Sequence, residues 1–397
     1  MLPISKMAAA VQPSATLAAA AKARQLKAEG KNIIDFSLGE PDFNTPAHIC
    51  DAATMAMREG KTHYTPASGI VELRKAIATL YQKTYGLEVS PEQVIVSNGA
   101  KHSLHNALAA TVGSGDEVLI PTPYWVSYSD LVQMTGASYK LIPTTEASGF
   151  KMTAAQLKSA ITPRSRLVMI NSPSNPTGSV YSRQELEALA DVILEAKLGV
   201  ISDEIYERLV FGNAMATCFA TLRPGLPETT ITISGVSKSY AMTGWRMGWA
   251  LGPLPVVKAM ANVQSQETSN PSSISQYAAI AALEGDQSCV EEMRREFEAR
   301  RDLICRRLNE LPGIRCPIPD GAFYAFFSVH HYLGKTLGGR KITDSTSFCA
   351  AALEIAHVNF VQGSAFGMEG YVRLSFATSR ELINQGVDRL ARFLHGM

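Results

Sequence analysis

Short apolar runs alternate with segments of helical spacing through the middle of the chain. Seven runs predict strands, at 94–98, 117–120, 138–142, 166–171, 198–202, 230–233 and 246–251. Helical spacing lies between most of these runs, at 101–112, 127–134, 153–160, 182–196 and 255–263. Apolar strands that alternate with helices of roughly 10–15 residues indicate a parallel or mixed sheet with helices on both faces. The expected fold class is therefore α/β.

The pattern changes near residue 285. Residues 290–309 predict a long, charged helix, followed by short strands at 322–327, 358–361 and 371–376 and a last helix at 380–394. We expect a large domain over 46–284 and a smaller α+β domain formed by 285–397 together with 1–45, which includes an N-terminal arm. The Gly- and Lys-rich segment 331–345 is expected to be a mobile loop. Whether it closes over a substrate is left open.

Composition narrows the class of partner. The chain is 46% hydrophobic and 18% charged, and 37 Lys plus Arg against 36 Asp plus Glu leave a net charge of +1. This balance gives no reason to expect a nucleic acid or a membrane as partner. The N-terminal apolar runs are shorter than the about 7–15 residues of a secretory core, so a cytoplasmic protein is expected. The scattered cysteines and histidines have no metal-type spacing, which predicts free thiols and no metal site.

Small and polar residues follow the predicted strands, where open α/β sheets bind their ligands. Gly99, Ala100 and Lys101 open a helix, and small residues there allow backbone N–H groups to approach a phosphate. Trp125 follows another strand and could stack on a flat ligand. Asn175 lies in the turn NSPSNPTG and could form a hydrogen bond with the same ligand. Each of these features alone is equally typical of an ordinary turn or core residue.

Charged residues at the next strand ends make the set more specific. Asp203 is costly to bury without a cation or a protonated heterocycle as partner, and Tyr206 could reach the same ligand. Lys238, in SGVSKSYAMTGWRMG, could lose its proton through desolvation and act as a nucleophilic amine. Arg246, expected to start the next strand, carries a planar fork that suits a phosphate. Together these are the components of a pyridoxal phosphate site.

At this point the chain resembles the fold-type I, pyridoxal-phosphate-dependent aminotransferases of class I and II. Within them it is most similar to bacterial aspartate aminotransferases with an N-terminal PSAT motif, some of which also act on prephenate. The matching stretches run nearly end to end: PSATLAAAAKA, GEPDF, THYTPASGI, PTPYWVSY, NSPSNPTG, SDEIYE, SGVSKSYAMTGWRMG, DGAFY and VRLSFATS. The resemblance implies a large domain with a mixed, mostly parallel seven-stranded sheet and a smaller α+β domain.

The resemblance also implies roles around the cofactor ring. Lys238 would form the internal aldimine and carry the proton. Asp203 would pair with the pyridinium nitrogen, Asn175 and Tyr206 would bind the phenolic oxygen, and Trp125 would stack on the ring. Lys238, Asp203 and Tyr206 are thus the expected catalytic residues.

The phosphate of the cofactor would be held by four residues of the same chain. These are Ala100 and Lys101, through their backbone, with Ser237 and Arg246. Tyr64 resembles the tyrosine that reaches the phosphate of the neighbouring subunit, which implies a homodimer with shared active sites. Some relatives carry a further phosphate-binding serine where this chain has Gly235; Ser234 or the backbone is expected to replace it.

The residues expected to contact the substrate are Gly39, Trp125, Asn175, Arg373, Lys101, Ser14 and Thr16. Gly39 and Arg373 match positions that bind the α-carboxylate. Lys101, Ser14 and Thr16 match those that bind a distal carboxylate in the PSAT subgroup, so a dicarboxylic substrate is favoured.

The implied reaction is ping-pong transfer of an amino group between an L-amino acid, best L-aspartate, and a 2-oxo acid, 2-oxoglutarate, through pyridoxamine phosphate. A prephenate or aromatic aminotransferase, or a β-lyase, remains an alternative on the same scaffold, although Gln12 replaces the basic residue usual in prephenate-accepting relatives. A nicotinamide-dependent dehydrogenase is disfavoured because no G-x-G-x-x-G follows the first strand. A non-catalytic regulator is disfavoured because both Lys238 and Asp203 are present.

Overall fold

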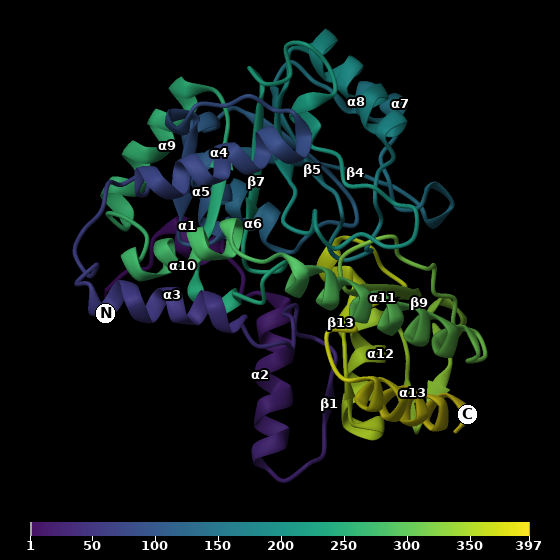
Figure 1. The fold of residues 1–397 in the computed structure, drawn as a ribbon. Coiled ribbons are helices and arrows are strands. Elements are labelled where there is room, and N and C mark those ends of the chain that lie inside the picture. The colour runs from purple at the N-terminus through teal and green to yellow at the C-terminus, as the bar shows by residue number, and fades with distance from the viewer. Residues whose placement is uncertain (1, 397) are drawn as a thin grey trace.

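The computed structural model describes residues 2–396, and a seven-stranded sheet forms the centre of the larger part (Figure 1). Its strand order is β2-β8-β7-β6-β5-β3-β4. The strands are β2 (Val94–Ser97), β3 (Glu117–Pro121), β4 (Ser138–Ile142), β5 (Ser165–Asn171), β6 (Gly199–Asp203), β7 (Thr230–Gly235) and β8 (Gly248–Leu251). Strand β8 runs antiparallel to both of its neighbours, and all other neighbouring pairs are parallel. The predicted mixed, mostly parallel sheet is confirmed.

Both faces of this sheet are buried under helices. Along β5, Leu167 and Met169 pack with α5 (Ala100–Thr111), α6 (Ser127–Met134) and α9 (Leu254–Glu267). Val168 and Ile170 point to the opposite face and pack with α7 (Ala154–Ala160) and α8 (Arg183–Ala196). Because successive strand residues face opposite sides, burial of both faces requires the near-continuous apolar runs seen in the sequence.

Three helices in the larger part are not predicted by the sequence pattern. They are α3 (Ala47–Arg58), α4 (Val71–Tyr85) and α10 (Ser273–Glu284), which join one apolar cluster with β2 and β8. All six cysteines are free, as expected. Within residues 2–396, no helix combines the length and the apolar composition that a membrane crossing requires.

The smaller part is built on a three-stranded antiparallel sheet, with order β13-β14-β9. Its strands are β9 (Tyr324–Ser328), β13 (Val361–Gln362) and β14 (Tyr371–Ser375), and its helices are α11 (Ser288–Asn309), α12 (Ser345–Ala351) and α13 (Arg380–His395). The predicted strand 358–361 is two separate strands, because β12 (Val358–Asn359) pairs instead with β1 (Ile34–Asp35). The N-terminal segment, which contains α1 (Lys6–Ala10), α2 (Ala15–Ala28) and β1, is thus joined to the C-terminal part of the chain by this strand pairing.

The expectation of a loop over 331–345 is wrong in part. This segment contains a small antiparallel hairpin of β10 (Thr336–Leu337) and β11 (Arg340–Lys341). Gly338 and Gly339 form its turn with φ of 52° and 81°. Two positive φ angles match the twist of a two-residue hairpin, and glycine adopts them without a steric penalty.

Candidate active site

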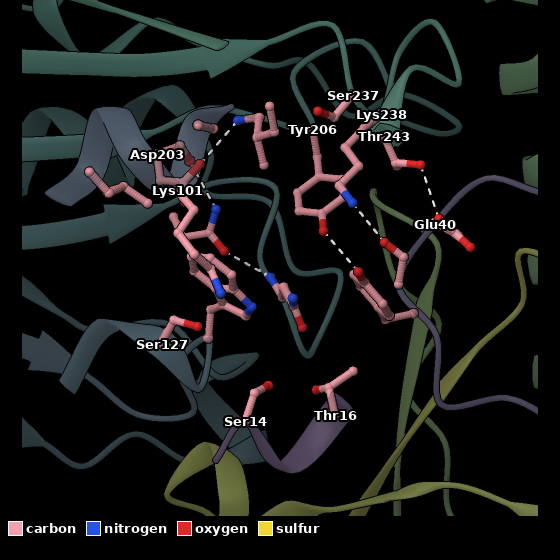
Figure 2. A pocket seen from close by; sticks show the side chains of 18 of the residues that line it. Ser14, Thr16, Glu40, Lys101, Ser127, Asp203, Tyr206, Ser237, Lys238 and Thr243 are labelled. Carbon is pink, nitrogen blue, oxygen red and sulfur yellow. Dashed lines mark hydrogen bonds between the residues drawn. The ribbon is translucent and has the colours of Figure 1, made fainter. Parts of the chain in front are cut away.

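A cavity of about 330 Å³ lies where the carboxyl ends of the central strands meet the N-terminal segment, β9 and β14. It brings together thirteen of the fourteen predicted site residues: Ser14, Thr16, Gly39, Ala100, Lys101, Trp125, Asn175, Asp203, Tyr206, Ser237, Lys238, Arg246 and Arg373. Figure 2 shows many of them around the cavity. These residues are up to several hundred positions apart in the chain. The sheet topology brings those that follow its strands together, because parallel strands end at one edge.

Lys238 follows β7 and reaches the cavity with its amine. Its Nζ donates a hydrogen bond to the carbonyl oxygen of Gly39, at 2.6 Å. Burial lowers the pKa of Lys238 to about 8, against a smaller opposing effect of Glu40. A larger share of this amine is therefore neutral at mildly alkaline pH than for an exposed lysine, as a nucleophile or a proton acceptor requires.

Asp203 ends β6 and is 4% exposed. The hydroxyl of Tyr128 donates to its Oδ2 at 2.6 Å, and the N–H of Ile205 donates to its Oδ1 at 3.2 Å. Burial raises the pKa of Asp203 to about 6, although both hydrogen bonds oppose this shift. A cation bound next to this carboxyl group would keep it ionised.

Arg373 projects from β14 and is 1% exposed. Its Nη1 donates to the side-chain oxygen of Asn175 at 3.0 Å, and its Nη2 donates to the carbonyl of Ser37 at 2.6 Å. The guanidinium also lies over the ring of Tyr324, 4.6 Å from its centroid. Within residues 2–396 it has no carboxylate partner, and its Nε has no hydrogen-bond partner. A buried cation in this state is suited to an anionic ligand.

The hydroxyl groups of Tyr206 and Tyr324 lie 2.8 Å apart. Burial raises the pKa of both phenols, so both remain neutral hydrogen-bonding groups. A Cβ added to Gly39 would overlap the Tyr324 hydroxyl. Only glycine therefore allows the backbone at residue 39 to approach this wall of the cavity.

The N-terminus of α5 forms a second anion-binding surface. Gly99, at φ 86°, precedes the helix, and a Cβ there would lie 2.5 Å from Nη2 of Arg246. A Cβ on Gly248 would overlap the backbone N of Ala100. These glycines hold the arginine against the first N–H groups of the helix, which lack partners within it. With Ser237 also on the cavity, this arrangement is suited to a phosphate.

One expectation about this surface is wrong, and one is narrowed. Arg246 does not start a strand, because it adopts φ 51° and β8 begins only at Gly248. The departure turns its side chain to the helix N-terminus. Of the two expected replacements for the missing serine, Ser234 is fully buried, does not line the cavity and donates through Oγ to Glu207 Oε2 at 3.0 Å, so the backbone remains the expected one.

Glu204 and Glu207 lie in the core, and burial raises the pKa of the first to about 8 and of the second to about 7. The folded chain therefore binds more protons than the unfolded chain above the ordinary glutamate pKa, so the free energy of unfolding falls as pH rises toward 8. Replacing Glu207 with glutamine should raise the melting temperature at pH 8.5, by roughly 2–4 °C for each kcal/mol gained, and leave it nearly unchanged at about pH 4, below the ordinary glutamate pKa. Thermal unfolding at both pH values measures this difference. The same gain in the exposed variant Glu59→Gln, or no gain in Glu207→Gln, would contradict the prediction.

The far end of the cavity carries Lys101, Trp125, Ser14 and Thr16. The Nζ of Lys101 lies over the ring of Trp125, 4.8 Å from its centroid. Thr16 Oγ1 is buried without a hydrogen-bond partner in the described part of the chain. Figure 2 shows Ser14 and Thr16 across the cavity from Ser237 and Lys238. This end therefore offers an amine and two hydroxyl groups to one ligand.

Tyr64 is the predicted site residue that does not line the cavity. Its side chain is 90% exposed. Within one chain it contributes nothing to this site.

Several residues that line the cavity were not given a role by the sequence analysis, among them three with polar groups in hydrogen bonds. Tyr128 follows Trp125 by three residues, and Tyr324 ends the motif DGAFY, so both lay within stretches already singled out. Glu40 lines the cavity and accepts a hydrogen bond from Thr243 Oγ1 at 3.0 Å. Their contacts join distant segments, which the sequence pattern does not reveal.

The family of this chain follows from comparison with known proteins. A family model described as aminotransferase class I and II matches residues 31–390. The chain belongs to this family. This aminotransferase is 47% identical to an aspartate aminotransferase of Geobacillus stearothermophilus, over 98% of both chains. It is 46% identical to an aspartate/prephenate aminotransferase of Cereibacter sphaeroides, over 99% of both chains.

Solved structures agree with this assignment. The aminotransferase superposes on the aspartate aminotransferase of Rhizobium meliloti with a TM-score of 0.97, at 43% identity and over 100% of both chains. An aspartate aminotransferase from Thermus thermophilus, solved with maleate, gives a TM-score of 0.93 at 40% identity, over 99% of this chain and 100% of that one.

Proposed function

We propose that this aminotransferase moves the amino group of L-aspartate to 2-oxoglutarate, with pyridoxal phosphate as cofactor. The observation that carries the choice of substrate is the pair of anion-binding ends in one cavity. Arg373 and Gly39 suit the α-carboxylate, and Lys101, Ser14 and Thr16 suit a second carboxylate. The maleate with which the Thermus thermophilus enzyme was solved is also a dicarboxylic acid, which supports the proposal.

The donor set of the cavity fits pyridoxal phosphate. Arg246, Ser237 and the N-terminus of α5 (Ala100, Lys101) would hold the phosphate. Asp203 would face the ring nitrogen, Asn175 and Tyr206 the ring oxygen, and Trp125 one face of the ring. When bound, the cofactor supplies an electron sink that stabilises negative charge at the Cα of the amino acid.

The residues of the chain perform the remaining tasks. Arg373 orients the substrate through its α-carboxylate, by two parallel charged hydrogen bonds. Lys238 takes the proton from the substrate Cα and holds it for return, which its lowered pKa favours. Asp203, ionised and held by Tyr128, keeps positive charge on the ring nitrogen. Amino donor and amino acceptor use the same two carboxylate sites in turn, which gives ping-pong kinetics.

Two copies of the chain would share their sites. Tyr64 is a large aromatic residue that is exposed and outside its own cavity. In the proposed homodimer it reaches the phosphate in the partner's site.

The absorbance spectrum of the purified holoenzyme, before and after addition of L-aspartate, tests the proposal. The cofactor band should shift on addition of L-aspartate and return on addition of 2-oxoglutarate. Lys101→Met should raise the KM for aspartate about 10-fold or more, because a hydrogen bond to a charged group contributes about 1.5–3 kcal/mol. The KM for phenylalanine should not rise. A spectrum that aspartate leaves unchanged but aromatic donors change would select the alternative substrate class instead. A spectral change when prephenate is added to the pyridoxamine form would also select it.

A further inference from the structure

The turn of residues 39–45 (GEPDFNT) contacts the loop that carries Lys238. The carbonyl of Gly39 accepts the hydrogen bond from Lys238 Nζ at 2.6 Å, and Glu40 accepts one from Thr243 Oγ1 at 3.0 Å. Thr45 Oγ1 donates to the carbonyl of Ala241 at 2.8 Å. One face of the turn is therefore fixed to residues 238–243 of the larger part.

The opposite face of the turn contacts α11 of the smaller part through one arginine. Arg300 Nη1 lies 2.6 Å from Oδ1 of Asp42. The Arg300 guanidinium also lies over the ring of Phe43, 5.1 Å from its centroid, and over that of Phe297, at 5.7 Å. The two phenylalanine rings pack edge to face at 5.4 Å. These contacts hold both members of the Asp42–Phe43 dipeptide against the helix.

Arg300 is 6% exposed, whereas the side chain of Asp42 is 32% exposed, so the contact joins a buried cation to a carboxylate at the surface. Its Nε is bound by Glu296 of the same helix at 2.9 Å, so Asp42 is its carboxylate partner from outside α11. A buried charge loses much more than an exposed one when a partner is removed. The ion pair and the stacking on Phe43 together tie the turn to the position of α11.

The helix α11 in turn packs in the cluster that contains the strands of the α-carboxylate site. Phe297 of α11 belongs to the same apolar cluster as Tyr324 of β9 and as Val372 and Leu374, which flank Arg373 on β14. Gly39 and Arg373 are 334 residues apart in the chain, and they are brought to one carboxylate by separate elements. Arg300 lies on a direct physical connection between them.

We propose that Arg300 and Asp42 are positioning residues for the α-carboxylate site: their ion pair fixes the turn that presents Gly39 at the distance from Arg373 that a bound carboxylate requires. The inference rests on the proposed function only in assuming that Gly39 and Arg373 bind that carboxylate. Neither Asp42 nor Arg300 lines the cavity. Without the ion pair, the amino acid binds more weakly, while Asp203 keeps its contacts with Tyr128 and Ile205, which lie outside the turn.

Asp42→Asn in the holoenzyme tests this inference, because it removes the charge and keeps the shape of the side chain. The KM for L-aspartate and the Kd for maleate, from calorimetry, should rise about 10-fold, since displacing a substrate-positioning group can cost up to about 10²-fold. The kcat should stay within about threefold, since the contact acts on binding and not on the proton transfer. Arg300→Lys, which keeps the charge but loses the planar fork and its stacking, should give a smaller rise in both constants.

The matched control is Asp388→Asn. Asp388 of α13 also lies 2.6 Å from an arginine of α11, Arg307, but this pair is remote from the turn. The control should leave KM and Kd unchanged. Wild-type constants in Asp42→Asn, an equal rise in Asp388→Asn, or a kcat that falls as much as KM rises would overturn the inference.

Failure of the proposed substrate can be told apart from failure of this inference. If the wild-type enzyme neither uses aspartate nor binds maleate, the substrate proposal fails. The Asp42→Asn and Asp388→Asn comparison is then made with the amino acid that the enzyme does accept, because every amino acid carries the α-carboxylate. A rise in its KM in Asp42→Asn alone supports the positioning role, and an unchanged KM overturns it.

Discussion

Replacing Lys238 with alanine should abolish amino transfer, lowering kcat by about 10⁴-fold, the upper end of what a positioned proton-transfer group contributes. The reason is local: no other amine lies at this point of the cavity among the residues that line it, since Lys101 lies over Trp125 at the distal end. Single-turnover measurement of the conversion of L-aspartate by the cofactor-loaded variant gives the rate. Binding of maleate should persist, because Arg373 and Lys101 are unchanged.

The control for this variant is Lys258→Ala, an exposed lysine of α9 outside the cavity, which should keep wild-type activity. A small primary amine added to Lys238→Ala should restore part of the rate, because it can enter the space left by the side chain and accept the proton. Activity of Lys238→Ala within tenfold of wild type would contradict the role of this lysine.

Replacing Arg373 with leucine should lower kcat/KM for L-aspartate by about 10²–10⁴-fold, since two hydrogen bonds to a charged group are lost at about 1.5–3 kcal/mol each. The fold should tolerate the change, because Arg373 has no carboxylate partner in residues 2–396 that would be left as a buried, unpaired charge. Steady-state kinetics with aspartate, and calorimetry with maleate, measure the loss.

Arg373→Lys distinguishes charge from geometry at the same position. It keeps the cation but loses the fork that bonds both carboxylate oxygens, so its kcat/KM should lie between the wild type and Arg373→Leu. Both variants should melt within a few degrees of the wild type. Equal kcat/KM in Arg373→Leu and the wild type would show that the α-carboxylate binds elsewhere.

The central sheet could be predicted because its strands are buried on both faces. Leu167, Val168, Met169 and Ile170 must all be apolar to pack alternately against two layers of helices. Helix α10 could not be found in the same way. It buries Ala278, Ala279 and Ala282, and such small residues give no strong helical period of large apolar side chains.

The residues of the candidate site could likewise be predicted only in part. Residues that directly follow a predicted strand, such as Asp203, could be placed in one cavity because parallel strands end at one edge of the sheet. Arg246 was found for its chemistry, but its left-handed backbone and its contact with Gly99 could not be foreseen, since they depend on the packing of β8 against α5. Tyr324 was missed because its partners come from distant segments: Tyr206 from the turn after β6 and Arg373 from β14.

The order and apolar pattern of the strands, together with the residue types at their ends, were enough to predict the fold class and the chemical groups of the candidate site, and the resemblance of motifs such as NSPSNPTG and SGVSKSYAMTGWRMG indicated the family. These features are local, so they can be recognised in the sequence itself. The tertiary structure alone decided which groups meet: Tyr128 with Asp203, Lys238 with Gly39, and Arg300 with Asp42. Such contacts, and the pKa shifts of Asp203 and Lys238, depend on which segments the folded core brings together and on how completely it excludes water.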